Sequence, residues 1–328
     1  MATIYIMKFT TNRLLGNKHI QTSYATLFRK PFLKDWSQEE FTLSDGDFIE
    51  IYWQNKPKRS ENKNIVLLFH GLAGSYKSPY IQGAVDALCK EGFACGVVHF
   101  RGCGDKENRL ARSYHSGETQ DNLEYLLYIH KTYPDAKIFC IGYSLGANML
   151  LKLLGEFKQN SFITAAVAVS APMQLEIAAK TIDSGTAKIY QKRLLDELKL
   201  SLLKKFDTYD FEKLIGLKKE EVQKMQSIRE FDERYTAPIH GFLSADDYYE
   251  KNSAKQFLKD IQTPTLIIHA ADDPFMTPEV LPKKEELSKY ITLEVSKQGG
   301  HVGFVGGSFF KPEYWLEKRI VAFIKLFT

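Results

Sequence analysis

Residues 137–157 read KIFCIGYSLGANMLLKLLGEF, and they are the most informative segment for predicting the fold. A continuous apolar run, typical of a buried strand, leads into a segment with helical patterning. They meet at Gly142–Gly146, which matches the pattern G-x-S-x-G. Such a strand–turn–helix holds its serine in a strained turn with the hydroxyl exposed above the sheet, and the flanking glycines remove side chains that would collide there. We therefore predict that Ser144 is a nucleophile.

Similar apolar runs recur along the chain, at residues 65–69, 93–100, 163–169, 265–269 and 291–295. Runs of this kind suit strands of a parallel sheet that is buried on both faces. Helical patterns lie between and after them, at about 79–91, 116–132, 145–157, 253–260, 278–288 and 312–326. The alternation predicts an α/β fold with a mostly parallel central sheet and helices on both faces. Before it, residues 40–53 alternate around Asp45-Gly46, which predicts an antiparallel hairpin.

One connection between the predicted strands is much longer than the others. The run that ends near Pro172 and the next run, which begins after Pro264, are separated by roughly ninety residues rich in Leu, Lys and Glu, too many for a structureless loop. We predict a core of residues 1–171 and 264–328, and a helical lid or cap insertion with a return helix at residues 172–263. The insertion is expected over the carboxyl ends of the strands, where open α/β sheets bind ligands.

The base and the acid that a serine nucleophile needs are predicted from chain order. Triads built on this motif run serine, acid, histidine, and of eight histidines only His301 follows both Ser144 and a plausible acid. Glycines on both sides allow its loop to reach over the sheet edge. The acid is expected in the loop at residues 270–275, which holds Asp272 and Asp273. Asp273 precedes proline, which favours an extended backbone, so it is preferred, with Asp272 as the alternative.

An oxyanion hole is expected from two backbone N–H groups. One belongs to Leu145, directly after the nucleophile, and the other comes from the loop after the first parallel strand, where Leu72 is the expected donor. Metal and cofactor binding are not predicted. The sequence has no paired C-x-x-C cysteines, no dinucleotide or phosphate-loop pattern, and no metal ligands at suitable spacing.

Composition excludes several other classes of protein. The net charge of +4 over 328 residues, with basic and acidic residues interleaved, argues against a nucleic-acid partner. A signal peptide and a spanning apolar run are absent from the sequence, so a protein without a transmembrane segment is expected. The four cysteines are interpreted as reduced thiols, and the predicted location is cytoplasmic.

Longer strings of the sequence resemble the bacterial YheT-type hydrolases of the α/β-hydrolase (abhydrolase) superfamily, a group that includes eukaryotic abhydrolase-domain lipid esterases. The strings that carry the resemblance cover most of the chain, at residues 17–22, 45–48, 99–103, 114–119, 142–146, 228–232, 272–276 and 300–304. Ala147 is a mild departure, since glycine is common there. The resemblance implies an α/β-hydrolase fold with a relay of Ser144, Asp273 and His301, and a carboxylic-ester hydrolase.

The predicted function is therefore a serine esterase that forms an acyl-enzyme, with a small-molecule or lipid-like ester as substrate. Leucines in residues 194–203 would favour an apolar acyl chain if some of them face the site. Two alternatives stay open from the sequence. One is an acyltransferase or thioesterase on the same scaffold, and the other is a non-catalytic binding protein that keeps the fold.

Overall fold

The computed structural model describes residues 8–59, 61, 63–158 and 162–328. Its centre is an eight-stranded sheet in the order β1-β2-β4-β3-β5-β6-β7-β8. Strands β1 and β2 form the predicted antiparallel hairpin, β2 also pairs antiparallel with β4, and the other neighbours are parallel. The strands are β1 (Ser37–Thr42), β2 (Phe48–Gln54), β3 (Ile65–Phe69), β4 (Ala94–Val98), β5 (Ile138–Tyr143), β6 (Ile163–Val169), β7 (Thr265–Ala270) and β8 (Ile291–Ser296).

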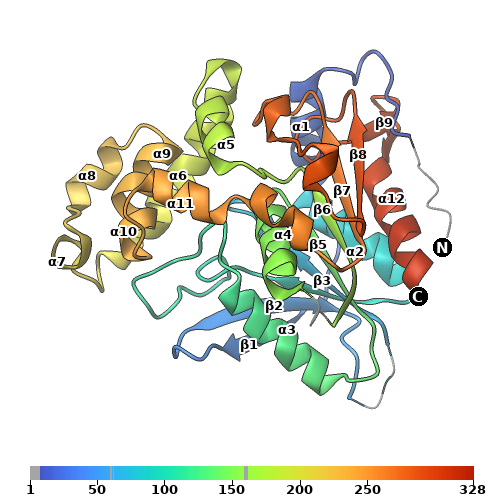
Figure 1. The fold of residues 1–328 in the computed structure, drawn as a ribbon, viewed down its shortest axis with the longest axis horizontal. Coiled ribbons are helices and arrows are strands. Elements are labelled where there is room, and N and C mark those ends of the chain that lie inside the picture. The colour runs from blue at the N-terminus through green and yellow to red at the C-terminus, as the bar shows by residue number, and fades with distance from the viewer. Residues whose placement is uncertain (1–7, 60, 62, 159–161) are drawn as a thin grey trace.

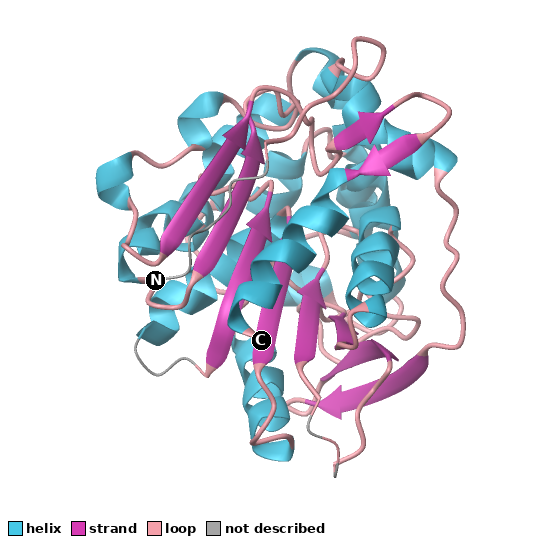
Figure 2. Cartoon of the chain, turned by 90° about the vertical axis from the view of Figure 1, so that its right-hand side faces the viewer, coloured by secondary structure: helices cyan, strands magenta, loops and turns pink. Residues whose placement is uncertain are grey.

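Helices cover both faces of this sheet, as predicted (Figure 2). Helices α3 (Gln120–Thr132) and α4 (Leu145–Phe157) contribute to one core, and α2 (Pro79–Lys90) and α12 (Trp315–Ile324) to the other. Side chains of a strand alternate between faces, so Leu67 of β3 enters the first core and Leu68 the second. Burial on both faces is the physical reason why β3, β4 and β5 are apolar throughout.

The connection between β6 and β7 is helical throughout its described elements. It contains α5 (Leu175–Ile182), α6 (Lys188–Lys205), α7 (Phe211–Ile215), α8 (Lys219–Lys224), α9 (Ile228–Phe231), a π-helical turn (Asp232–Thr236), α10 (Ala237–Ile239) and α11 (Ala245–Asn252). Helices α6 to α11 gather to one side of the sheet (Figure 1). They enclose a small core of their own around Leu202, Phe211 and Tyr235. The domain boundaries at 172 and 263 stay a prediction.

Three predicted helices differ in the structure. Residues 254–260 form a 3-10 helix, and 278–288 contain only two 3-10 turns (Pro278–Val280 and Lys284–Glu286). Pro282 lacks the N–H that a continuous helix would need there. The predicted helix at 312–326 begins as a short strand, β10 (Pro312–Tyr314), which pairs with β9 (Val305–Gly307).

Helix α1 (Lys18–Phe28) was not predicted as a helix, and it begins at the Asn17 cap, whose side chain accepts hydrogen bonds from the N–H groups of His19 and Ile20. The four cysteines are free. Within the described ranges, no helix combines the length and the apolar character needed to cross a bilayer.

Candidate active site

Ser144 lies in the sharp turn between β5 and α4, with backbone angles φ 51° and ψ −118°. A positive φ is unfavourable for a residue with a side chain, so the surrounding structure must hold this conformation. The neighbouring glycines explain how it does so. A Cβ on Gly142 would lie 2.5 Å from the carbonyl oxygen of Gly146, and one on Gly146 would lie 2.5 Å from that of Phe69. The turn therefore packs at distances that only glycine allows.

His301 lies in the loop after β8, and its imidazole faces the Ser144 hydroxyl. The distance from His301 Nε2 to Ser144 Oγ is 2.8 Å, and Nδ1 lies 2.8 Å from Oδ2 of Asp273. A proton on Nδ1, donated to the Asp273 carboxylate, leaves Nε2 free to accept a proton from the serine. The three side chains that the sequence singled out thus form one hydrogen-bonded chain.

The two adjacent aspartates have different partners. Asp273 is buried, and besides His301 its carboxylate accepts a hydrogen bond from the N–H of Phe275. Asp272 points elsewhere, and its Oδ1 accepts a hydrogen bond from the N–H of Gly300. Asp273 is therefore the carboxylate that contacts the His301 imidazole, while Asp272 connects the histidine loop to the loop after β7.

Helix α1 supports the histidine loop, a contact that was not predicted from the sequence. The N–H of His301 donates to the hydroxyl of Thr22 at 2.9 Å. The Gln21 side chain is fully buried and bonds both the N–H and the carbonyl of Val305. Gly300 and Gly303 allow the loop to lie directly against the α1 backbone. Through these contacts with the loop backbone, α1 holds the His301 imidazole in position.

The N–H groups of Leu72 and Leu145 have no hydrogen-bond partner within the described part of the chain. Both residues line the cavity that contains Ser144. The loop of Leu72 lies close to the nucleophile, since a Cβ on Gly71 would be 3.2 Å from the Ser144 Cβ. Free N–H groups beside a nucleophile are suited to bind a developing oxyanion.

The cavity around Ser144 has a volume of about 600 Å³. Its walls come from the core, from α1 and from the helical insertion, and most of the side chains that line it are apolar. They include Leu27, Leu175, Ala179, Ile182, Leu194, Phe275 and Met276. The Phe275 ring stacks on the His301 imidazole with a centroid distance of 4.1 Å. Of the leucines in α6 noted in the sequence, Leu194 faces this cavity, whereas Leu195 and Leu202 are buried within the insertion.

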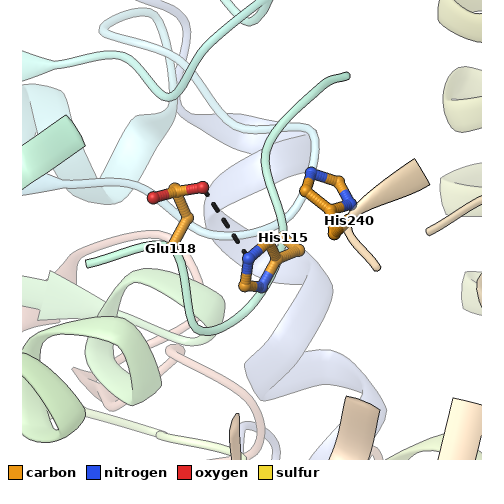
Figure 3. Close-up of side chains that lie close together, drawn as sticks. All are labelled: His115, Glu118 and His240. Carbon is orange, nitrogen blue, oxygen red and sulfur yellow. Dashed lines mark ion pairs between the residues drawn. The ribbon is translucent and has the colours of Figure 1, made fainter. Parts of the chain in front are cut away.

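Three side chains outside this site could offer ligands to a metal ion: His115, Glu118 and His240 (Figure 3). Their contacts serve another purpose. The two ring nitrogens of His240 face the carbonyl oxygens of Thr236 (2.7 Å) and Ser113 (2.9 Å). Glu118 accepts a hydrogen bond from the Arg112 guanidinium at 2.8 Å. A metal ion would have to displace these bonds, so we interpret the cluster as a link between the insertion and the core.

Comparison with known proteins agrees with this fold. The family model described as the alpha/beta hydrolase fold matches residues 64–308. YheT of Escherichia coli (strain K12), provisionally named an esterase, is 42% identical over 315 residues, which cover 95% of this chain and 92% of YheT. The monoacylglycerol lipase of Saccharomyces cerevisiae is 27% identical, with 84% of this chain and 62% of the lipase covered. The solved structure of the Pyrococcus furiosus esterase Pf2001 aligns with a TM-score of 0.58 at 16% identity, with 99% of each chain covered. The chain therefore belongs to the α/β-hydrolase family.

Proposed function

We propose that this protein is a serine hydrolase that cleaves carboxylic esters. The observation that carries the proposal is the hydrogen-bonded chain from Ser144 through His301 to Asp273, which opens into a cavity with apolar walls. Similarity to proteins named esterase and monoacylglycerol lipase agrees with this activity.

In the proposed reaction, Ser144 Oγ attacks the ester carbonyl carbon while His301 Nε2 takes the hydroxyl proton. The N–H groups of Leu72 and Leu145 donate to the oxyanion, and Asp273 stabilises the imidazolium. The alcohol leaves with the proton from His301, and an acyl-enzyme remains. Water, deprotonated by His301, then releases the acid and restores the serine.

The large cavity supports an apolar acyl group, and hence a lipid-like ester. Its volume of about 600 Å³ falls within the usual size of small-molecule sites. The insertion contributes Leu175, Ile182 and Leu194 to its walls, and we propose that it serves as the lid predicted from the sequence. The free cysteines fit the predicted cytoplasmic location, because thiols stay reduced there.

The test is hydrolysis of p-nitrophenyl esters of increasing chain length by the wild type and by Ser144→Ala. We expect Ser144→Ala to lower kcat by about 10⁴-fold or more, and to abolish labelling by a fluorophosphonate probe. Ser184→Ala, which changes an exposed serine of the insertion, serves as the control. Equal hydrolysis by Ser144→Ala and wild type would refute the proposal, and a preference for acetyl over longer acyl groups would refute the lipid-like substrate.

A further inference from the structure

A second cavity, of about 230 Å³, lies between the insertion and the core. It adjoins the catalytic cavity, because Leu72, Leu145 and Asp232 line both. The two proposed oxyanion donors therefore lie where the cavities meet. The volume is smaller than the about 300–1,000 Å³ typical of sites for whole ligands. The second cavity is therefore large enough for one polar group of a substrate whose ester bond lies at Ser144.

Three of the segments that carry the family resemblance meet at this second cavity. They are residues 99–103, 114–119 and 228–232, which supply Arg101, Tyr114, His115 and Asp232, among others, to its walls. None of them belongs to the chain of Ser144, His301 and Asp273. Side chains from three separate segments thus converge on a space that the proposed ester cleavage leaves without a role.

The charge of this cavity is negative. Arg101 is fully buried and already pairs with Asp47 (2.8 Å) and Asp121 (2.7 Å), so its positive charge is compensated. Burial lowers the pKa of His115 well below its usual 6.5, and the imidazole is neutral near pH 7. Glu197 pairs with Arg193 at the surface. Arg229 lies near enough to Asp232 to lower its pKa electrostatically, but it forms its ion pair with Asp246 at 2.7 Å. Among the described residues of the wall, the carboxylate of Asp232 is therefore the charge without a direct ion-pair partner.

Asp232 is 8% exposed and opens the π-helical turn after α9, a type of irregularity that is frequent at functional sites. It accepts hydrogen bonds from the hydroxyls of Tyr249, at 2.7 Å, and Thr236. An ionised carboxylate offers about four acceptor positions, so two remain open toward the cavities. In the described ranges it forms no ion pair. Burial raises its pKa to about 6, and it is therefore mostly ionised at neutral pH.

Aromatic side chains complete the wall beside this carboxylate, namely those of Tyr114, Phe231, Tyr235 and Tyr248. Aromatic rings attract cations through their negative faces, and ammonium groups are often recognised in this way. A buried carboxylate without a cation is costly unless a partner arrives. Negative charge and aromatic walls together favour a positively charged group over an anionic one.

We propose that the second cavity binds an ammonium group of the substrate and that Asp232 pairs with it. The inference rests on the proposed esterase function and narrows its substrate to esters of amino alcohols. The acyl chain occupies the larger cavity, the ester carbonyl lies at Ser144, and the ammonium group reaches Asp232. Cleavage breaks the acyl–oxygen bond, and the amino alcohol departs with the proton that His301 took from Ser144.

The test compares two esters of the same shape, butyrylcholine and 3,3-dimethylbutyl butyrate, in which carbon replaces the charged nitrogen. We expect wild-type kcat/KM to be about 10-fold or more higher for the choline ester, because a desolvated cation is attracted by the aromatic rings and by the carboxylate. Asp232→Asn keeps the shape but removes the charge, and should lower the ratio of the two kcat/KM values toward 1, since only the attraction of the aromatic rings then remains. If Asp232 has a purely structural role, Asp232→Asn will lower both kcat/KM values together and leave their ratio unchanged.

Asp207→Asn is the matched control, because Asp207 is an exposed acid of the same insertion that pairs with Lys219 and does not line the cavity, and the ratio should stay at its wild-type value. If Asp232→Asn does not fold, inhibition of wild-type p-nitrophenyl butyrate hydrolysis by choline, compared with 3,3-dimethylbutanol, tests the same preference. Equal rates for the two esters, or a stronger preference for glyceryl butyrate, would overturn the ammonium site alone. If the wild type hydrolyses no ester, including p-nitrophenyl butyrate, the proposed esterase function itself is wrong.

Discussion

The charge of the buried Asp232 carboxylate lowers the stability of the folded protein. Its pKa is raised by burial from 3.8 to about 6. Below about pH 4 the carboxyl is protonated in both the folded and the unfolded chain, so it does not lower the free energy of unfolding. Between pH 4 and 6 the unfolded chain loses the proton first, so the free energy of unfolding falls as pH rises. Above pH 6 the cost is complete.

We therefore predict that Asp232→Asn is more stable than the wild type at pH 8 and about equal to it near pH 4. A tenfold change in an acid constant corresponds to about 1.4 kcal/mol, so the gain at pH 8 is up to about 3 kcal/mol. Thermal unfolding at the two pH values measures it. A variant that is less stable than wild type at pH 8 would show that the charge itself holds the turn together.

The histidine pair His115 and His240 leads to a prediction about metals. Because the ring nitrogens of His240 face backbone carbonyl oxygens and Glu118 is held by Arg112, EDTA should change neither the Tm nor the rate of ester hydrolysis. Dialysis against EDTA, followed by activity assay and metal analysis, tests this. A drop in Tm that added Zn²⁺ reverses would instead identify the cluster as a metal centre.

At the scale of residues, the sequence was most informative where local chemistry requires a particular side chain. Gly142 and Gly146 had to be small beside a strained serine, and chain order pointed to His301. The choice between Asp272 and Asp273 rested on one local clue, the proline after Asp273. Thr22 and Phe275, which hold the imidazole, carried no signal of their own, because their contacts depend on segments far away in the chain.

Among the elements, α1 and the histidine loop form one unit. A Cβ on Gly303 would lie 2.3 Å from the carbonyl oxygen of Gln21, so Gly303→Ala must push the loop away from α1. A displacement of about 1 Å can cost on the order of 100-fold in rate, and we expect kcat for p-nitrophenyl esters to fall by about that factor.

Gly306→Ala provides the comparison for this prediction. It adds the same methyl group three residues further on, where the nearest atom is 3.2 Å away, and it should alter kcat only slightly. Circular dichroism would establish that both variants fold. Full activity of Gly303→Ala would mean that α1 does not position His301.

The central strands β3, β4 and β5 could be predicted well because burial on both faces makes them apolar from end to end. The segments at 253–260 and 278–288 were misjudged, since short apolar patterns do not distinguish an α-helix from 3-10 turns. Helix α1 was missed because much of its surface is polar or exposed, and its buried side chains Gln21 and Tyr24 do not form an apolar stripe.

For the molecule as a whole, Lys205 connects the insertion to the core. It is buried at the end of α6, and its ammonium group donates to Asn108 Oδ1 and the carbonyl of Leu110, each at 2.6 Å. Lys205→Met would leave the buried Asn108 Oδ1 without its donor, at a cost of about 1–3 kcal/mol, whereas the carbonyl of Leu110 would keep the bond from Asn108 Nδ2. We expect a lower urea midpoint and faster proteolysis within residues 172–263.

Lys204→Met is a suitable control because the neighbouring Lys204 is exposed and lies 3.9 Å from Glu107 at the surface. It should leave the midpoint and the proteolysis rate near those of the wild type. If both lysine variants behave alike, the insertion is held by its apolar contacts, and the Lys205 bonds are incidental.

The bond between Thr22 and His301 joins residues that are 279 positions apart. During synthesis a ribosome makes α1 early and the histidine loop late, while the turn with Ser144 emerges between them. If these residues act as proposed, a nascent chain in which the turn with Ser144 has folded still lacks His301. It also lacks the contact between the histidine loop and Thr22 that positions the imidazole. Hydrolysis would then begin only after the histidine loop has been made and has docked on α1, so chains that still lack this loop would not attack esters in their surroundings.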